Sequence, residues 1–191
     1  MIRSKKIRII GGYWRSRKLT LTPNSLLRPT TNKIRETIFN WITHVSHLQY
    51  AHCLDCYAGS GALAIEALSR NAQTVTLLEK NKYSFIQIKK NLTDLGISFP
   101  NPQIKIINTN TLSWLSKTGM PFNIVFIDPP FRSNLGEKTI QILEKYKRLT
   151  HEAWIYVEKS INSPMYNLPP NWLLYRKGST RQVSYSLYYR S

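Results

Sequence analysis

The stretch NIVFIDPPF, residues 123–131, holds residue types that could do chemistry. Its apolar run predicts a buried strand that ends on the carboxylate of Asp128. Pro129 and Pro130 follow, and because each ring fixes its own φ angle, the loop should be rigid. The Asp128 carboxylate and the backbone carbonyl of Pro129 would be fixed acceptors, and Phe131 a flat face for a stacked base. Such a site could hold an amino group, although the same residues could form an ordinary turn.

The elements around this stretch alternate between strand and helix. The predicted strands are 52–55, 74–79, 103–107, 123–127 and 153–158, and the predicted helices are 62–70, 82–95, 111–118 and 135–148. Such repeated units form a parallel sheet covered by helices on both faces. Two further strands are predicted at the end of the chain, with Gly178 in their turn. The sequence therefore predicts an α/β fold with a seven-stranded, mostly parallel sheet and an antiparallel strand pair at its C-terminal end.

The first 45 residues predict two smaller elements ahead of this sheet. Residues 7–22 predict a β-hairpin with Gly11-Gly12 as its turn. Residues 28–42 predict a helix that follows Pro29 and is capped by Thr30 or Thr31. We expect residues 1–27 to form a basic hairpin extension and residues 28–191 the main domain, in one compact unit.

The positive charge is concentrated at the two ends of the chain. The net charge is +17, residues 1–35 contain ten Lys and Arg and no acid, and residues 159–191 contain five and no acid. The middle segment, residues 36–158, holds twelve bases and all ten acids. Basic flanks around a nearly neutral domain indicate a nucleic-acid partner, although a solvated basic surface would give the same composition.

A glycine-containing loop follows the strand at 52–55. It reads Asp55-Cys56-Tyr57-Ala58-Gly59-Ser60-Gly61, and Glu79 ends the next strand. Its glycines would let the backbone approach a ligand closely, and the Glu79 carboxylate could accept both hydroxyls of a ribose. The loop also satisfies a loose dinucleotide fingerprint. Asp55 argues against that cofactor, because an acid repels phosphate but suits the cationic amino-acid end of S-adenosylmethionine. A strand–helix turn without a ligand is the third explanation.

Cys53 and Cys56, with histidines upstream, could suggest a metal site. Cys53 lies within an apolar strand, where a thiol usually acts as a small hydrophobic group. We therefore predict neither a metal site nor a structural disulfide.

The loop after residue 55 resembles that of S-adenosylmethionine-dependent methyltransferases with the Rossmann-like fold. The Asp-Pro-Pro-Phe stretch, residues 128–131, resembles the signature of the members that methylate amines. The lone pair of a nucleobase amine is delocalised into the ring, which makes the amine a poor nucleophile. Its two N–H bonds must be held by acceptors while the nitrogen points at the methyl carbon. The resemblance therefore implies catalytic residues Asp128, Pro129, Pro130 and Phe131.

Four stretches resemble bacterial small-subunit ribosomal RNA guanine-N2 methyltransferases: residues 8–19, 27–42, 53–70 and 123–131. They occur in the same order, and residues 153–189 also fit, so the resemblance covers nearly the whole chain. It implies the class I methyltransferase fold, S-adenosyl-L-methionine as cofactor, and methylation of one guanine in 16S ribosomal RNA. It also implies that an assembling small subunit is preferred to naked RNA.

The resemblance implies a role for individual residues at the cofactor site. Asp55, Gly59 and Gly61 would line the methionine part, Glu79 would hold the ribose, and Asn110 would accept a hydrogen bond from the adenine amine. The full set of expected cofactor-binding residues is Asp55, Tyr57, Ala58, Gly59, Gly61, Glu79, Asn110, Arg28 and Thr30. Arg28, Thr30 and Arg35 could instead meet RNA phosphate, or serve only as helix caps and solvated charges.

The hairpin supplies most of the expected RNA-binding residues. Basic side chains between aromatic ones can contact phosphates and stack on bases. The candidates are Arg8, Tyr13, Trp14, Arg15, Arg17, Lys18 and Arg35. The two aromatic residues could instead simply pack on the domain.

Three other functions remain open at this point. A DNA adenine-N6 methyltransferase shares the Asp-Pro-Pro-Phe chemistry, but 191 residues leave little room for a separate target-recognition domain. A basic ribosome assembly factor would need no intact cofactor site, and a nicotinamide oxidoreductase is disfavoured by Asp55. No secretory signal or membrane span is evident, so we expect a cytoplasmic protein without a membrane partner, acting as a monomer.

Overall fold

The computed structural model describes residues 5–22, 31–130 and 133–191. Its helices are α1 (Asn32–Val45), α2 (Ala62–Ser69), α3 (Lys82–Asp94), α4 (Thr111–Leu115) and α5 (Leu135–Lys145), with a short 3₁₀ helix at Leu48–Tyr50. Its strands are β1 (Lys6–Arg8), β2 (Lys18–Thr20), β3 (His52–Asp55), β4 (Thr74–Glu79), β5 (Ile104–Asn108), β6 (Phe122–Ile127), β7 (Leu149–Ser160), β8 (Trp172–Ser179) and β9 (Val183–Arg190). Each predicted element is present, and β3 and β4 have the predicted bounds.

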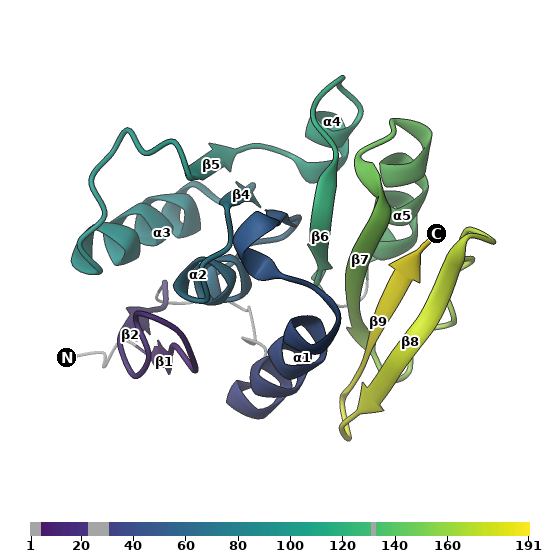
Figure 1. Cartoon of the computed structure of the whole chain (residues 1–191), viewed down its shortest axis with the longest axis horizontal. Helices are drawn as coiled ribbons and strands as arrows, with labels where there is room; N and C mark the ends of the chain where they lie inside the picture. The colour runs from purple at the N-terminus through teal and green to yellow at the C-terminus, as the bar shows by residue number, and fades with distance from the viewer. Residues whose placement is uncertain (1–4, 23–30, 131–132) are drawn as a thin grey trace.

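Seven strands form one sheet in the order β5-β4-β3-β6-β7-β9-β8 (Figure 1). The first five strands in this order, β5, β4, β3, β6 and β7, are parallel to one another. Strand β9 runs antiparallel to both β7 and β8. The predicted mostly parallel sheet with an antiparallel C-terminal pair is therefore confirmed. β7 is longer than predicted because it pairs with β6 from Leu149 and with β9 as far as Ser160.

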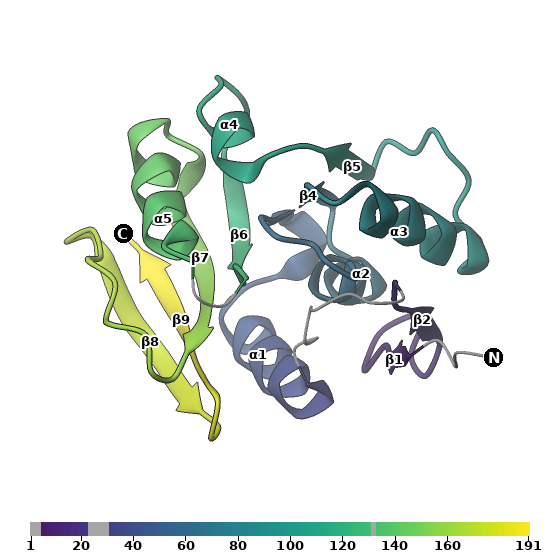
Figure 2. The ribbon, with the colours of Figure 1, turned by 180° about the vertical axis from the view of Figure 1, so that it is seen from behind.

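Helices cover both faces of the sheet, as Figures 1 and 2 show from opposite sides. One core joins α1, α2 and α3 to one face, and a second core joins α4 and α5 to the other. Side chains of a strand alternate between the two faces, so Ile124 and Phe126 of β6 enter the first core while Val125 and Ile127 enter the second. This double burial explains why the strand is an unbroken apolar run.

The prediction that Gly178 occupies the last turn is wrong. Gly178 lies inside β8 opposite Tyr185, and the chain turns between Ser179 and Val183. A Cβ atom on Gly178 would lie 2.4 Å from the ring of Tyr185. That ring stacks on Trp41 of α1, with centroids 5.6 Å apart. The glycine therefore makes room for a ring that connects the sheet to a helix.

The N-terminal hairpin packs on α2 and α3. Its side chains Ile9, Trp14 and Leu19 are buried in the same core as α1 and α2. Asn91 of α3 bonds both the backbone N–H and the carbonyl of Thr20, each at 3.0 Å. Gly12 has a φ of +75°, and a Cβ atom there would lie 1.8 Å from the carbonyl oxygen of Ser69. The division into an extension over residues 1–27 and a domain over residues 28–191 stays a prediction.

A buried carboxylate, that of Glu66 in α2, connects the hairpin to two helices. It accepts the backbone N–H groups of Ile10 and Gly11 at 2.8 and 2.7 Å and the Nε of Arg70 at 3.0 Å. It also forms an ion pair with the buried Arg35 of α1, at 3.6 Å. Three segments distant in sequence therefore meet at one side chain.

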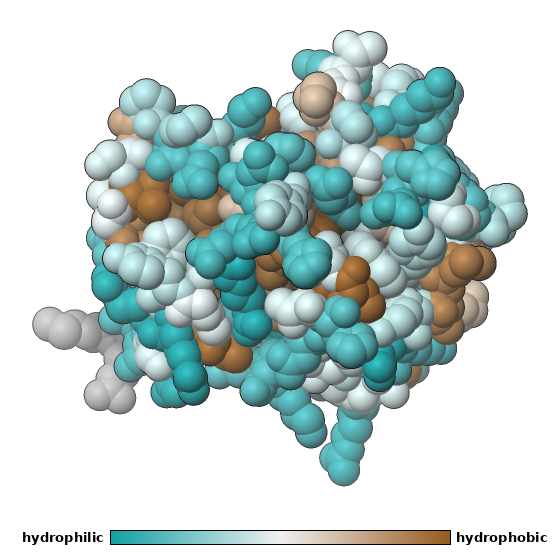
Figure 3. Space-filling model, in the orientation of Figure 1, coloured by the Kyte–Doolittle hydropathy of each residue, from teal (hydrophilic) through white to brown (hydrophobic). Residues whose placement is uncertain are grey.

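The surface seen in Figure 3 is mainly hydrophilic, with several separate hydrophobic patches. Within the described residues, no helix is long and apolar enough to cross a membrane. Cys53 and Cys56 are free and buried, and burial raises the pKa of the Cys53 thiol to about 12.

We predict that Glu66→Ala strongly destabilises the fold. The change leaves the Arg35 guanidinium buried without its counter-charge, so the free energy of unfolding should fall by roughly 3–5 kcal/mol in urea titrations. The exposed Glu36 gives the matched control, and Glu36→Ala should change stability by less than about 0.5 kcal/mol. Equal effects of the two changes would contradict a structural role for the buried carboxylate.

Candidate functional site

The loop between β3 and α2 is shaped by two glycines with positive φ angles, Gly59 at +53° and Gly61 at +77°. Gly61 is the N-cap residue of α2, and a Cβ atom on it would lie 3.1 Å from Ile65 and 3.3 Å from Leu77. The backbone N–H of Cys56 bonds the Phe126 carbonyl at 3.0 Å, which fixes the start of the loop beside β6. The glycines thus allow a tight turn that brings the backbone to the carboxyl edge of the sheet.

Glu79 ends β4 beside this loop. One carboxylate oxygen accepts the N–H of Gly59 at 2.7 Å, and the other accepts the N–H of Asn81 at 2.6 Å. Burial raises the pKa of Glu79, while these backbone hydrogen bonds oppose the shift. A carboxylate has about four lone-pair sites, so two bonds leave acceptor capacity toward a ligand.

Asn110 follows β5 and caps α4. Its side-chain oxygen accepts the N–H of Ser113 at 3.1 Å and lies 3.3 Å from the Ser113 hydroxyl. Both acceptor sites of that oxygen are therefore occupied within the protein. The predicted acceptance of a bond from the adenine amine is unfavourable in this arrangement. The amide nitrogen, a donor, is the group that remains to face a ligand.

Asp128 and the two prolines follow β6, as the sequence predicts. Asp128 is partly exposed, Pro129 is buried and Pro130 is exposed. The carbonyl of Pro130 accepts the hydroxyl of Ser133, which lies just ahead of α5, at 2.7 Å. The Asp128 carboxylate is therefore partly accessible to solvent, directly after the buried strand β6.

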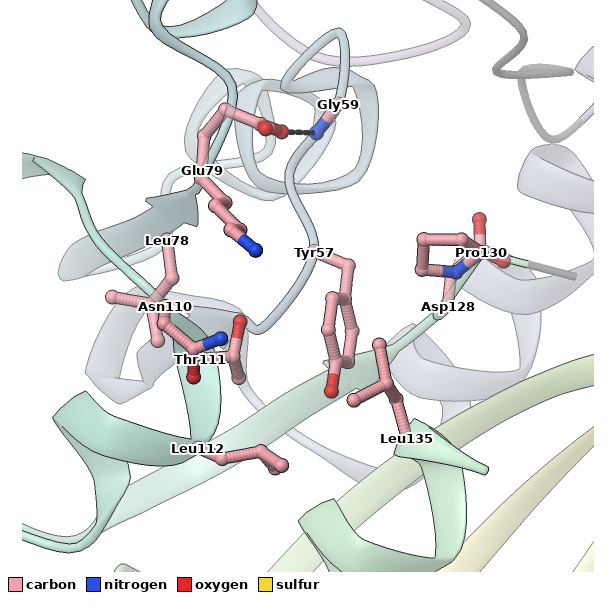
Figure 4. Close-up of a pocket in the computed structure, with 11 residues that line it drawn as sticks. Tyr57, Gly59, Leu78, Glu79, Asn110, Thr111, Leu112, Asp128, Pro130 and Leu135 are labelled. Atoms are coloured by element: carbon pink, nitrogen blue, oxygen red, sulfur yellow. Dashed lines mark hydrogen bonds between the residues drawn. The ribbon is translucent and has the colours of Figure 1, made fainter. Parts of the chain in front are cut away.

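These four segments line one cavity of about 220 Å³ (Figure 4). Of the predicted site residues, the structure brings together Tyr57, Gly59, Glu79, Asn110, Asp128 and Pro130. Asp55, Ala58, Gly61 and Pro129 lie outside the lining, and Phe131, Arg28 and Thr30 are outside the described residues. The lining residues that sequence analysis missed are Leu78, Lys80, Thr111, Leu112 and Leu135.

Most of the missed residues are neighbours of predicted ones. Leu78 and Lys80 flank Glu79, and Thr111 and Leu112 follow Asn110. Their position next to a predicted site residue could therefore have identified them as lining residues. Leu135 had no such signal, because it is at the start of α5. Tyr57, another lining residue, contacts the same helix, because its hydroxyl lies 2.6 Å from that of Thr139.

Asp55 differs from the prediction that it would line the cavity. It is only 2% exposed, at the end of β3, and the N–H of Tyr57 donates to its carboxylate at 3.4 Å. Burial raises its pKa to about 7, and the neighbouring Glu79 adds a smaller increase. In this conformation the Asp55 carboxylate is buried next to the loop backbone and does not line the cavity.

The RNA-binding candidates do not all reach the surface. Arg8, Arg15, Arg17 and Lys18 are exposed, and Tyr13 is 86% exposed. Trp14 is only 8% exposed and packs in the core, and Arg35 is fully buried. The prediction that Trp14 stacks on RNA and that Arg35 contacts phosphate is therefore contradicted by their burial. Arg35 instead donates to the Arg8 carbonyl at 2.7 Å and pairs with Glu66.

Comparisons with known proteins agree with this fold. A family model described as conserved hypothetical protein 95 matches residues 7–189. The protein is 47% identical to ribosomal RNA small subunit methyltransferase D of Escherichia coli, over 98% of this chain and 91% of the relative. It is 46% identical to the solved structure of E. coli yhhF, with a TM-score of 0.87 over 98% and 99% of the two chains. A Thermus thermophilus 16S rRNA N2 G1207 methyltransferase shares the fold at 13% identity, with a TM-score of 0.70 over 99% of this chain and 50% of that one.

We predict that Asp55→Asn stabilises the protein in a pH-dependent way. An unfolded aspartate titrates near pH 4, whereas the buried one titrates at about 7. Between these values the folded state retains a proton that the unfolded state releases, so the wild type loses stability as pH rises through this window. In urea titrations, the free energy of unfolding of the asparagine variant should exceed that of the wild type by an amount that grows to about 3–4 kcal/mol between pH 4 and 7. Above pH 7 this difference should stay constant. Asp94→Asn, at an exposed site, should show no such trend, and a constant difference for Asp55→Asn would contradict the raised pKa.

Proposed function

This chain belongs to the ribosomal RNA small subunit methyltransferase D family, and we propose that it methylates the exocyclic N2 amine of a guanine in 16S ribosomal RNA. The proposed cofactor is S-adenosylmethionine, and the preferred substrate is an assembled small subunit in the cytoplasm. One observation carries the proposal: Asp128 and Pro130 share a cavity with Glu79 and Asn110. The loop proposed to hold the amine, with Asp128 and Pro130, and the residues proposed to hold the nucleoside, Glu79 and Asn110, thus line the same cavity.

The residues of this cavity suit S-adenosylmethionine. Glu79 retains acceptor capacity for the two ribose hydroxyls. The Asn110 amide nitrogen, which points into the cavity in Figure 4, could donate to a ring nitrogen of adenine. Leu78 and Leu112 offer apolar contacts to the adenine faces. These groups suit a nucleoside that carries no phosphate, because the Glu79 carboxylate would repel a phosphate attached to the ribose.

The reaction needs orientation more than a strong base. When bound, the cofactor supplies a methyl group activated by its sulfonium. The Asp128 carboxylate would accept one N–H of the guanine amine, and the carbonyl of Pro129 would accept the other. With both N–H bonds held, the nitrogen lone pair points away from the loop toward the methyl carbon. The two prolines hold these acceptors in place before the base arrives.

A product assay tests the proposed function. Labelled S-adenosylmethionine is offered with unmethylated small subunits, naked 16S RNA or duplex DNA, and the products are digested to nucleosides and identified by mass spectrometry. We expect labelled N2-methylguanosine, chiefly from the subunits. Labelled N6-methyladenine from DNA would refute ribosomal RNA as the substrate, but it would still support methylation of an exocyclic amine. Absence of transfer and of cofactor binding in calorimetry would favour a noncatalytic assembly factor.

We predict that Asp128→Ala slows methyl transfer by at least about 100-fold, because the amine loses one of its two positioning acceptors. Cofactor affinity measured by calorimetry should change little, since the proposed partner of Asp128 is the base. Asp94→Ala removes an exposed aspartate on α3 and serves as the control. Turnover near the wild-type rate in Asp128→Ala would reject the assigned role.

The exposed basic residues of the hairpin are the proposed RNA contacts, and they predict a change in salt dependence. Replacing Arg15, Arg17 and Lys18 with glutamine should weaken RNA binding and reduce the slope of log affinity against log salt by roughly two units. The control replaces three exposed basic residues near the other end of the chain, Arg176, Lys177 and Arg181. An unchanged slope in the hairpin variant, or an equal change in the control, would contradict the proposal that the hairpin contacts RNA.

A further inference from the structure

A second cavity, of about 490 Å³, lies at the opposite edge of the sheet. Its wall includes the first residues of three parallel strands, His52 of β3, Thr74 of β4 and Phe122 of β6. The methyl-transfer site is formed by the loops that follow the carboxyl ends of these strands. In Figure 1, β6 runs downward, so this cavity is near its upper end, beside the loop that follows α4.

The wall of this cavity contains a buried cation, Arg148, which is between α5 and β7 and only 2% exposed. Its Nε and Nη1 atoms have no hydrogen-bond partner in the described part of the chain. Its guanidinium lies over the rings of Trp114 and Phe122, at 4.4 and 5.6 Å. Ring contacts offset part of the cost of burying a charge, but they leave N–H donors unsatisfied.

Arg35 shows how this fold treats a buried arginine that has a structural role. Arg35 is also fully buried, and its Nε and Nη1 atoms likewise lack a hydrogen-bond partner. Its charge is nevertheless balanced, because Glu66 lies 3.6 Å away, and its Nη2 donates to two oxygens. Arg148 has no such carboxylate among the described residues. The titratable group that acts on Arg148 electrostatically is Cys56, and burial raises the pKa of that thiol well above its usual range, so it is not an anion. Within the described residues Arg148 therefore lacks a counter-charge, which an anionic ligand would supply.

The rest of the cavity fits an anion. Lys105 and Lys117 are exposed residues of its lining, and no aspartate or glutamate is in that lining. Gly119 leaves the space that the guanidinium occupies, because a Cβ atom there would lie 1.8 Å from Nη1 of Arg148. A planar guanidinium with two nearby ammonium groups matches the oxygen geometry and charge of a phosphate.

We propose that this cavity binds a phosphate group, held by Arg148 and by Lys105 and Lys117. The site is separate from the methyl-transfer site. The phosphate would come either from the backbone of RNA or from a free mononucleotide. The proposal does not depend on the proposed function, because binding at this site can be measured without S-adenosylmethionine or methyl transfer.

The test follows the indole N–H signal of Trp114 by NMR in phosphate-free buffer. Inorganic phosphate, guanosine monophosphate and a short single-stranded RNA are titrated separately. We expect saturable shifts, and affinity about tenfold weaker in Lys105→Gln/Lys117→Gln, which corresponds to about 1.4 kcal/mol. Lys89→Gln/Lys90→Gln, two exposed lysines of α3, is the control with the same charge change.

A second variant separates binding from folding. Arg148→Met removes the buried charge but keeps much of the side-chain volume, so it should abolish the phosphate shift without lowering the thermal midpoint. A shift by RNA and not by the mononucleotide would assign the phosphate to RNA, and the reverse would assign it to a free nucleotide. Absence of a saturable shift with all three probes, or an unchanged shift in Arg148→Met, would overturn the proposal.

Discussion

The parallel arrangement of β3, β4, β5 and β6 is the constraint on which the site depends. Because these strands run in one direction, the residues that follow them gather at one edge of the sheet. β3 has β4 on one side and β6 on the other, and the chain continues from β3 and from β6 into helices on opposite faces. Open α/β sheets hold ligands where their loops separate in this way. Glu79 and Asp128, which are 49 positions apart in the numbering, therefore line one cavity.

Buried charge is handled in three different ways in this molecule. Glu66 is neutralised by Arg35 and by backbone N–H groups, and this connects the hairpin to the domain. Asp55 has a raised pKa, so near neutral pH part of the population carries a proton instead of a charge. Arg148 has aromatic rings and no carboxylate among the described residues. Arg35 also has N–H donors without acceptors, but among these described groups only Arg148 lacks a carboxylate as well, which is why it points to a ligand.

The basic hairpin combines two roles that composition alone does not separate. Its inward side chains, Trp14 among them, complete the core of the domain, and its outward ones remain in solvent. Gly12 and Asn91 fix the position of the hairpin through backbone contacts, so the exposed basic residues are presented on a fixed support. A rigid hairpin of this kind orients its charges toward a partner at a smaller cost in conformational entropy than a free tail would.

The sequence by itself determined the fold class and several of the residues that line the candidate site. Strand–helix alternation identified the parallel sheet, and the ends of strands identified Glu79 and Asp128, because these signals are local in the chain. The tertiary structure decided burial and hydrogen-bond occupancy. It buried Trp14 and Arg35, which removes them from the expected RNA contacts, left Asp55 buried outside the cavity lining and used the Asn110 oxygen as a helix cap. It also placed Gly178 inside β8 and made Arg148 a buried cation without a carboxylate. These features depend on neighbours that are distant in sequence, and no local pattern records which neighbours a side chain meets.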